Sequence, residues 1–324
     1  MENAILFGNG LNLLNNGISW DDLLKKISDR EHLIAGIPNT MQYETIILAS
    51  DYFLYEPFIL ADGNQFITAD GNKFMVKDKP AEEALKNKIK FELENFTSNF
   101  AYERLSRLNV EHFITTNYDN TLYNLFCSKG YIKGISNNTE SLYSIRRRFG
   151  LQYDNITHKY IWPIHGTIHY PKSMMLGLDH YCGSIAKINA YIKGEYNYTK
   201  EGKPFILKDI ISRLRNKECE MPLSWIDLFF THNIHIIGFG LQYDEIDLWW
   251  ILNRRQRYIR QYGEMLISNK IYFYGNIEDN KKALLMRLGV EVVSFEYEGL
   301  NTSDPLYYNK QYDYYLNMIE KHGK

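Results

Sequence analysis

Two short polar clusters hold the residues of this 324-residue chain that are best suited to chemistry. Thr116-Asn117-Tyr118-Asp119 follows an apolar run that begins at Val110, and His165-Gly166 follows an apolar run that begins at Tyr160. Amide and carboxylate side chains can orient a substrate or a water molecule, and a histidine can accept or donate a proton near neutral pH. Each cluster also has a plainer interpretation, because an Asn or Asp after a strand often caps the next helix and a buried His can be a hydrogen-bonded core residue.

Glycines follow two further apolar runs. Residues 4–7 lead into Gly8-Asn9-Gly10-Leu11-Asn12, and residues 234–237 lead into Gly238-Phe239-Gly240-Leu241. Glycines at the end of a strand let the backbone come close to a phosphate, whose charge free N–H groups can bind. The third glycine of the dinucleotide-binding fingerprint is missing, since Leu13 stands in its place, so the first match alone is also compatible with a tight turn.

These runs have the features of buried parallel strands. They are short, apolar and β-branched, and each stops at a polar or glycine-rich cluster; residues 270–274 form another such run, which ends in Gly275-Asn276. In a doubly wound parallel sheet the carboxyl ends of the strands meet at one edge, where these folds bind their ligands. We therefore predict an α/β fold with a Rossmann-like, doubly wound parallel sheet. Asn117 and Asp119, two residues apart in extended backbone, should point to the same side.

The chain divides into three predicted parts. Residues 1–35 and 105–300 form the sheet domain, which binds the ligand. Residues 36–104 form a mostly helical insertion with a small hairpin, and residues 301–324 form a tyrosine-rich C-terminal tail.

Local patterns predict several features within these parts. Two copies of an eight-residue unit with Asp-Gly turns, at 61–68 and 69–76, predict the hairpin. One long helix is expected from Pro80 to about Leu108. We expect a flexible excursion at 195–221, a loop at 178–181, and a solvated face for the basic run 146–148.

The composition favours a soluble, cytoplasmic protein that binds neither nucleic acid nor membrane. Lys and Arg number 37 against 39 Asp and Glu, so the net charge of the whole chain attracts neither partner. No apolar run reaches the length of a membrane span, and residues 1–7 do not have the character of a signal peptide. The three cysteines form no Cys-x-x-Cys pair, which favours a reducing compartment and argues against a structural zinc site.

Taken in chain order, the strand ends resemble the signature motifs of sirtuins. The matching segments are Gly8-Asn9-Gly10-Leu11-Asn12 for the GAGxS loop, Thr116-Asn117-Tyr118-Asp119 for TQNxD, His165-Gly166 for the catalytic HG, Gly238-Phe239-Gly240-Leu241 for GTSL, and Asn276 for the asparagine that contacts the adenosine ribose. The chain departs from sirtuin deacylases because it lacks their four-cysteine zinc module and the Asp-Phe-Arg that follows their glycine loop. In these respects it is similar to the SIR2-like domains of bacterial anti-phage systems, which hydrolyse NAD+ rather than deacylate proteins.

This resemblance implies a site for NAD+ as substrate, without a metal. Asn117 would orient water and the ribose hydroxyls, His165 would be a general base that is neutral at pH 7, and Asp119 would orient the site. The glycines would give backbone N–H groups to the phosphates, and Asn276 would contact the adenosine ribose. The cofactor-binding positions by this match are Gly8, Asn9, Gly10, Asn12, Thr116, Gly238, Gly240 and Asn276.

Other functions stay open on the sequence alone. The same fold could bind NAD+ or ADP-ribose as a sensor without turnover, serve as a structural subunit, or, less favoured, deacylate proteins. An NAD+ hydrolase must be held inactive until it is needed, so we expect a homo-oligomer or a partner defence protein to control it. The expected contact surfaces are the tail around Tyr312 and residues 66–76, although the tail could instead pack on its own sheet domain.

Overall fold

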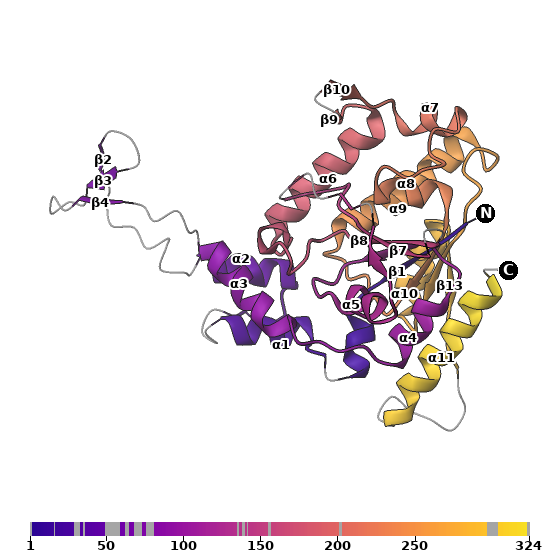
Figure 1. The fold of residues 1–324 in the computed structure, drawn as a ribbon, viewed down its shortest axis with the longest axis horizontal. Helices are drawn as coiled ribbons and strands as arrows, with labels where there is room; N and C mark the ends of the chain where they lie inside the picture. Colours follow the sequence, from indigo (N-terminus) through magenta and orange to yellow (C-terminus); the bar gives the residue numbers. More distant parts are fainter. Residues whose placement is uncertain are drawn as a thin grey trace.

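An eight-stranded sheet forms the centre of the molecule (Figure 1). The computed structural model describes residues 2–15, 17–28, 33–34, 36–48, 59–61, 65–67, 73–75, 81–134, 136–137, 140, 142–154, 157–200, 203–296 and 304–322. The strands of the sheet are β1 (Asn3–Phe7), β5 (His112–Thr115), β6 (Ile132–Lys133), β7 (Phe149–Tyr153), β8 (Thr157–Pro163), β11 (Asn233–Ile237), β12 (Ile271–Tyr274) and β13 (Val290–Val293).

The strand order is that of a doubly wound fold. The sheet runs β13-β12-β11-β1-β5-β8-β7-β6; the strands from β13 to β8 are parallel, and β7 and β6 are antiparallel additions at one end. From β1 the chain builds outward through β5 and β8, and it then returns to the other side of β1 with β11. This reversal creates a topological switch point beside β1, and folds of this kind bind ligands there, at the carboxyl ends of the strands.

Helices cover both faces of the sheet. One face carries α6 (Leu178–Lys193), α7 (Ile210–Arg215), α8 (Trp225–Thr231), α9 (Ile246–Tyr262) and α10 (Asp279–Arg287), and the other carries α4 (Phe100–Arg107), α5 (Thr121–Ser128) and α11 (Pro305–His322). Each face of the sheet has its own apolar core. Successive residues of β1 contribute to these cores alternately, since Ala4 and Leu6 are buried in the first and Ile5 and Phe7 in the second. The predicted α/β class and Rossmann-like sheet are confirmed. In the part of the chain that the structure describes, no helix is both long and apolar enough to cross a membrane.

A third apolar cluster lies over the carboxyl ends of the strands. It joins α1 (Trp20–Ile27), α2 (Asn39–Leu48) and α3 (Ala81–Leu93) to Tyr118 and Leu176, which follow β5 and β8. Ser19 starts α1, because its hydroxyl accepts a hydrogen bond from the backbone N–H of Asp22 at 3.1 Å. These helices therefore cover the edge at which the sequence places its polar clusters.

The expectation of one long helix over residues 80–108 is wrong. Residues 94–99 separate α3 from α4. The Asn99 side chain accepts hydrogen bonds from the backbone N–H groups of Ala101 and Tyr102, at 3.0 and 3.3 Å. Asn is favoured at an N-cap and disfavoured inside a helix, so a new helix starts here.

Two small sheets and two 3-10 helices complete the described chain. Residues of the repeated unit lie in an antiparallel sheet of β2 (Ile59–Ala61), β3 (Gln65–Ile67) and β4 (Lys73–Met75), although the turns between these strands lie outside the described residues. A second small sheet pairs β9 (Asn197–Lys200) with β10 (Lys203–Ile206), and two 3-10 helices are η1 (Asn9–Leu14) and η4 (Pro171–Ser173).

Two segments expected to be irregular are ordered. Within 195–221 lie β9, β10 and α7, and Arg213 of α7 makes a buried ion pair with Asp227 at 2.9 Å. Residues 178–181 are the first turn of α6 rather than a loop. In both cases tertiary contacts accompany the regular structure, and local polarity does not reveal them.

The basic run at 146–148 is not a solvated face. Arg147 is buried, the Arg146 guanidinium lies 3.6 Å from the centre of the Tyr198 ring, and that of Arg148 lies 4.9 Å from the centre of the Tyr160 ring. Planar guanidinium groups stack well on aromatic rings, so these arginine side chains contribute to internal packing.

The C-terminal tyrosines pack on the chain's own sheet. Tyr312, Tyr315 and Leu316 of α11 are buried in the same core as Ile5 and Phe7 of β1. Of the two interpretations of this tail, the structure favours intramolecular packing, and Tyr312 is not an exposed contact residue. The predicted domain boundary at 104–105 also falls inside α4, which packs in this same core.

Candidate active site

A cavity of about 210 Å³ lies at the carboxyl ends of β1, β5, β8 and β11. Asn117, Asp119 and His165 all line it, together with residues of both glycine loops. The helices α1, α2 and α3 close the outer side of the cavity, to which they contribute Trp20, Thr40 and other lining side chains. The three predicted catalytic residues are thus brought to one place, as expected for parallel strands that end at a common edge.

Asn117 is fixed just beyond the end of β5. Its backbone N–H donates to the Thr115 hydroxyl at 3.0 Å, and the preceding N–H, that of Thr116, donates to the Phe7 carbonyl of β1 at 3.3 Å. The side chain is buried with only 7% of its surface exposed, and it borders the cavity. Backbone and side chain are therefore both held before any ligand arrives.

Asp119 joins the first glycine loop to the end of β5. One carboxylate oxygen accepts from Asn12 Nδ2 at 2.8 Å, and the other accepts from the backbone N–H of Thr121 at 2.9 Å, at the start of α5. The capping interpretation of this residue is thus correct as well, although α5 has Asn120 at its N-cap position. Asn12 is buried outside the cavity and is not among the residues that line it.

His165 enters the cavity from a tight loop after β8. Gly166 has a φ of +97°, and a Cβ atom there would lie 2.2 Å from the Ser173 carbonyl oxygen. Only glycine permits this approach, because other residues rarely adopt that backbone conformation and their Cβ would clash. The loop then folds back, and the Met175 N–H donates to the His165 carbonyl at 2.8 Å.

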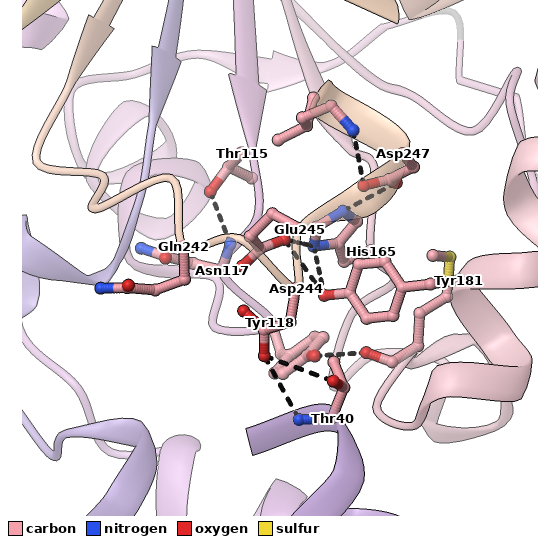
Figure 2. A network of polar contacts seen from close by, with 12 residues as sticks. Thr40, Thr115, Asn117, Tyr118, His165, Tyr181, Gln242, Asp244, Glu245 and Asp247 are labelled. Carbon is pink, nitrogen blue, oxygen red and sulfur yellow. Dashed lines mark hydrogen bonds and ion pairs between the residues drawn. The ribbon is translucent and has the colours of Figure 1, made fainter. Parts of the chain in front are cut away.

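Two carboxylates flank the His165 ring (Figure 2). Nε2 lies 3.1 Å from Asp247 Oδ2, and Nδ1 lies 3.6 Å from Glu245 Oε2. The Tyr181 hydroxyl contacts both Nδ1, at 3.4 Å, and the same Glu245 oxygen, at 3.2 Å. Asp247 is fully buried and also accepts the backbone N–H of Leu248, at 2.8 Å.

These charges shift the protonation equilibrium of His165, which is expected from the sequence to be a neutral base. Burial alone would lower the pKa of His165, but the negative charges of Asp247 and Glu245 outweigh burial and raise that pKa above its ordinary value. Burial raises the pKa of Glu245 to about 7, with Asp247 and Asp244 adding to the shift. The protonation of His165 is therefore coupled to that of Glu245, and the two side chains titrate as a pair.

The first glycine loop packs tightly against the second. The Gly8 N–H donates to the Ile237 carbonyl at 3.3 Å, and the Gly10 N–H donates to the Gly238 carbonyl at 2.8 Å. A Cβ on Gly10 would lie 2.7 Å from that same carbonyl oxygen. The expectation that Gly8 and Gly10 give N–H groups to phosphates is therefore wrong for this structure, since both donors are occupied. The glycines instead allow the backbones of the two loops to approach each other closely.

The second glycine loop is better placed to hold an anion. Among the described residues, no hydrogen bond uses the backbone N–H groups of residues 238–241. Gly238 and Leu241 have φ angles of +62° and +45°, so the loop turns sharply at both positions. Gly238 and Gly240 border the first cavity and also a second cavity of about 370 Å³ beside it.

Asn276 borders the second cavity, but its amide is fully engaged. Nδ2 donates to the Phe295 carbonyl at 2.8 Å and to the Tyr307 hydroxyl at 2.9 Å. Oδ1 accepts from the Phe295 N–H at 2.8 Å and from the Tyr315 hydroxyl at 3.2 Å. Two donors and two acceptor positions exhaust an amide, so Asn276 here anchors α11 to the sheet, and a ribose contact would have to replace one of these bonds.

The comparison with known protein families gives one match. The family model of the SIR2-like domain matches residues 111–291, which is more than half of the chain and extends from β5 into β13. The chain belongs to the SIR2-like domain family. Within this SIR2-like segment lie Asn117, His165 and the second glycine loop, whereas the first glycine loop and α11 lie outside it. No curated protein matches the chain.

The SIR2-like cavity has an acidic wall. Of the described residues that line it, Asp119, Asp244 and Glu245 are carboxylates and none is Lys or Arg. His165, Glu245 and Asp247 are the one group in the described part of the chain whose ligand atoms, within 4.8 Å of one another, are close enough to share a metal ion. The ion pairs among these three side chains already account for their proximity.

Four residues of the SIR2-like site escaped the sequence analysis. Tyr181, Glu245 and Asp247 surround His165, and Tyr102 lies against Asn117. The acidic run that directly follows the second glycine loop is a local signal for the two carboxylates. The tyrosines have no such signal, because each lies on a helix separate from the strand end that it contacts, 15 or 16 positions away along the chain.

Proposed function

We propose that this SIR2-like chain hydrolyses NAD+ at the nicotinamide–ribose bond and releases nicotinamide and ADP-ribose. The observation that carries the proposal is an acidic cavity at the sheet edge in which Asn117 and His165 meet. The nicotinamide ring of NAD+ is cationic, and the transition state for its departure places positive charge on C1′ of the ribose. Carboxylates with low exposure favour such charge more strongly than water does.

The reaction needs a placed water rather than a strong nucleophile. Water adds to C1′, the C1′–nitrogen bond breaks, nicotinamide leaves as a neutral molecule, and one proton is released. The Asn117 amide would orient the water and the ribose hydroxyls, and the released proton would pass to the pair formed by His165 and Glu245. Asp247 would hold the imidazole ring in place through Nε2, and such proton acceptors contribute ~10²–10⁴-fold.

The two cavities match the two ends of a dinucleotide. The nicotinamide end would occupy the cavity beside His165, and the N–H groups of residues 238–241 would bind the diphosphate between the cavities. The adenosine end would lie in the second cavity, beside Ile277 and the tyrosines of α11. Binding of the ribose to Asn276 remains part of the proposal and requires one of its four present hydrogen bonds to be exchanged.

Hydrolysis is favoured over protein deacylation as the activity. Cys127 of α5 and Cys182 of α6 are exposed, Cys219 is buried, and none of them belongs to the group that could share a metal ion. By its resemblance to NAD+-depleting SIR2-like domains, we propose that the chain is an effector of anti-phage defence in the cytoplasm. Self-association or a partner protein would keep it inactive until infection.

The direct test is NAD+ turnover by the purified chain. We would separate nicotinamide and ADP-ribose by chromatography, with the chain alone and together with the proteins encoded beside it. Asn117→Ala and His165→Ala should each abolish turnover while circular dichroism shows an unchanged fold.

Three results would contradict this assignment. Wild-type turnover in either variant would show that the assigned residues are wrong. Binding of NAD+ by calorimetry without turnover in any combination would favour the sensor function. A requirement for an acyl-lysine peptide would favour a deacylase.

A further inference from the structure

A buried tyrosine of α4 lies directly behind Asn117. Tyr102 has no exposed surface, and its ring packs edge-on against Phe7 of β1, with ring centres 5.9 Å apart. Its hydroxyl is 3.4 Å from Asn117 Nδ2 and 2.6 Å from Asn12 Oδ1. Tyr102 thus connects the first glycine loop to Asn117, just beyond the end of β5, from a position outside the cavity.

The hydrogen bonds around Tyr102 have one consistent direction. Asp119 can only accept as a carboxylate, so Asn12 must turn its NH₂ group toward Asp119, where the distance is 2.8 Å. Asn12 Oδ1 is then left to face Tyr102, and the phenol donates its single proton to it. The phenol oxygen can now only accept, so Asn117 must turn its NH₂ group inward.

The phenol keeps the proton that this direction requires. Burial raises the pKa of Tyr102 well above its ordinary value, and the charge of Asp119 adds to the shift. Asn9 supports the same arrangement, because its Oδ1 accepts a second bond from Asn12 Nδ2 at 3.0 Å. Each contact in this chain thus has one donor and one acceptor, and the assignments agree with one another.

We infer that Tyr102 is a positioning residue that fixes the Asn117 amide with its carbonyl oxygen toward the cavity, through the chain Asp119–Asn12–Tyr102–Asn117. This inference rests on the proposed hydrolysis of NAD+ and names the orientation that the reaction uses. An inward-facing NH₂ group leaves the carbonyl oxygen to accept a proton from water or from a ribose hydroxyl. A flipped amide would offer a donor there and could not orient the water in the same way.

The break between α3 and α4 is what delivers Tyr102 to this place. Asn99 caps α4, and its Nδ2 donates to the Leu11 carbonyl of the first glycine loop at 2.7 Å. The start of α4 is therefore fixed to the same loop that carries Asn12. A single unbroken helix would not have this anchor beside the site.

The test compares two tyrosine substitutions. Tyr102→Phe keeps the ring and removes the hydroxyl from the chain of contacts. Tyr191→Phe is the matched control, because Tyr191 is equally buried and its hydroxyl donates to Asp227 at 2.8 Å in the core on the other face of the sheet. Both variants lose two buried hydrogen bonds, those with Asn12 and Asn117 in Tyr102→Phe and those with Asp227 and Arg213 in Tyr191→Phe. Bonds to charged groups contribute more to stability, so Tyr191→Phe should lose at least as much stability as Tyr102→Phe.

Two readouts separate positioning from stability. Tyr102→Phe should lower kcat about three- to tenfold and leave KM unchanged, as the loss of one oriented hydrogen bond predicts. In the presence of methanol, which can add to C1′ in place of water, it should also raise the ratio of methyl ADP-ribose to ADP-ribose. Tyr191→Phe should change neither quantity.

A second variant covers the case in which Tyr102→Phe does not fold. Asp119→Asn keeps the shape of the side chain but removes the acceptor-only group that sets the direction, so it should lower kcat and shift the methanol ratio in the same sense. Unchanged kcat and ratio in these variants, or an equal loss of kcat in Tyr191→Phe, would overturn the inference. Absence of turnover in the wild-type chain would instead overturn the proposed function.

Discussion

At the scale of single residues, the position of His165 between two carboxylates determines how the site handles a proton. Burial in an apolar core lowers the pKa of a histidine, whereas the charges of Asp247 and Glu245 outweigh burial here and raise the pKa of His165. The acidic surroundings suit a cationic substrate, and they also make the pKa of His165 dependent on Asp247 and Glu245. Asp247 is the partner that can be substituted without changing the lining of the cavity, since it is fully buried and does not line the cavity.

Replacing Asp247 by Asn should therefore slow turnover without preventing binding. The Asp247 charge favours the imidazolium, so its removal should lower the pKa of His165 and loosen the hold on Nε2. We expect kcat to fall about tenfold or more, with little change in KM, as measured by steady-state kinetics. Asp179→Asn, an exposed change on α6, is the control and should leave kcat unaltered. Equal kcat values for Asp247→Asn and the wild-type chain would remove Asp247 from the site.

At the scale of elements, an ion-pair cluster fastens the covering helices to the sheet domain. Glu82 of α3 lies 2.7 Å from His180 Nε2 of α6 and 2.6 Å from Lys86 Nζ of its own helix. The bond from His180, aided by Lys86, lowers the pKa of Glu82 from 4.5 to about 2 against the opposing effect of burial. The charged form of Glu82 is thus the one that the folded state favours.

This shift predicts a defined dependence of stability on pH. A carboxyl whose pKa is lower in the folded state stabilises it above the unfolded-state pKa, and this contribution disappears as the pH falls from 4.5 toward 2. Glu82→Gln should lower the free energy of unfolding by about 1 kcal/mol at pH 7, after allowance for partial exposure, and by less as the pH falls through that range.

Urea unfolding at pH 7, 4 and 3 measures this effect. Glu94→Gln, an exposed change just beyond α3, is the matched control and should have no such dependence. A difference between Glu82→Gln and the wild-type chain that stays constant over this range would contradict the assignment.

At the scale of the whole molecule, α11 is part of the core rather than an appendage. Its buried side chains meet β1 and β12, and Tyr307 and Tyr315 hold Asn276 at the edge of the second cavity. A truncation that removes α11 would expose this core, so it cannot serve as a simple test of self-association. The proposed control by an oligomer or a partner protein must use other surfaces or the exposed side of α11.

A pair of leucine substitutions in α11 tests this role. Leu316→Ala removes a side chain with no exposed surface and should lower the free energy of unfolding by about 2–5 kcal/mol. Leu306→Ala, in the same helix but 56% exposed, should change it by less than about 0.5 kcal/mol. Denaturant unfolding measures both values. Similar small losses in the two variants would show that α11 is not a core element in solution.

The sheet and the edge at which the site lies could be predicted from the sequence. Short apolar runs that end in polar or glycine clusters follow from local rules, because a buried parallel strand needs apolar side chains on both faces and its carboxyl end is where polar groups can emerge. Asn117, Asp119 and His165 were predictable for this reason, and so was the nearness of both glycine loops.

The partners of these residues, in contrast, become known from the folded chain. The contacts of His165 with Asp247, of Asn12 with Asp119 and of Tyr102 with Asn12 each join residues more than 80 positions apart, and no local pattern encodes them. The same holds for the occupied N–H groups of Gly8 and Gly10 and for the four bonds of Asn276, which depend on how closely two loops and α11 approach. The raised pKa of His165 arises from the charges of Asp247 and Glu245 outweighing burial, and this arrangement exists only in the folded chain.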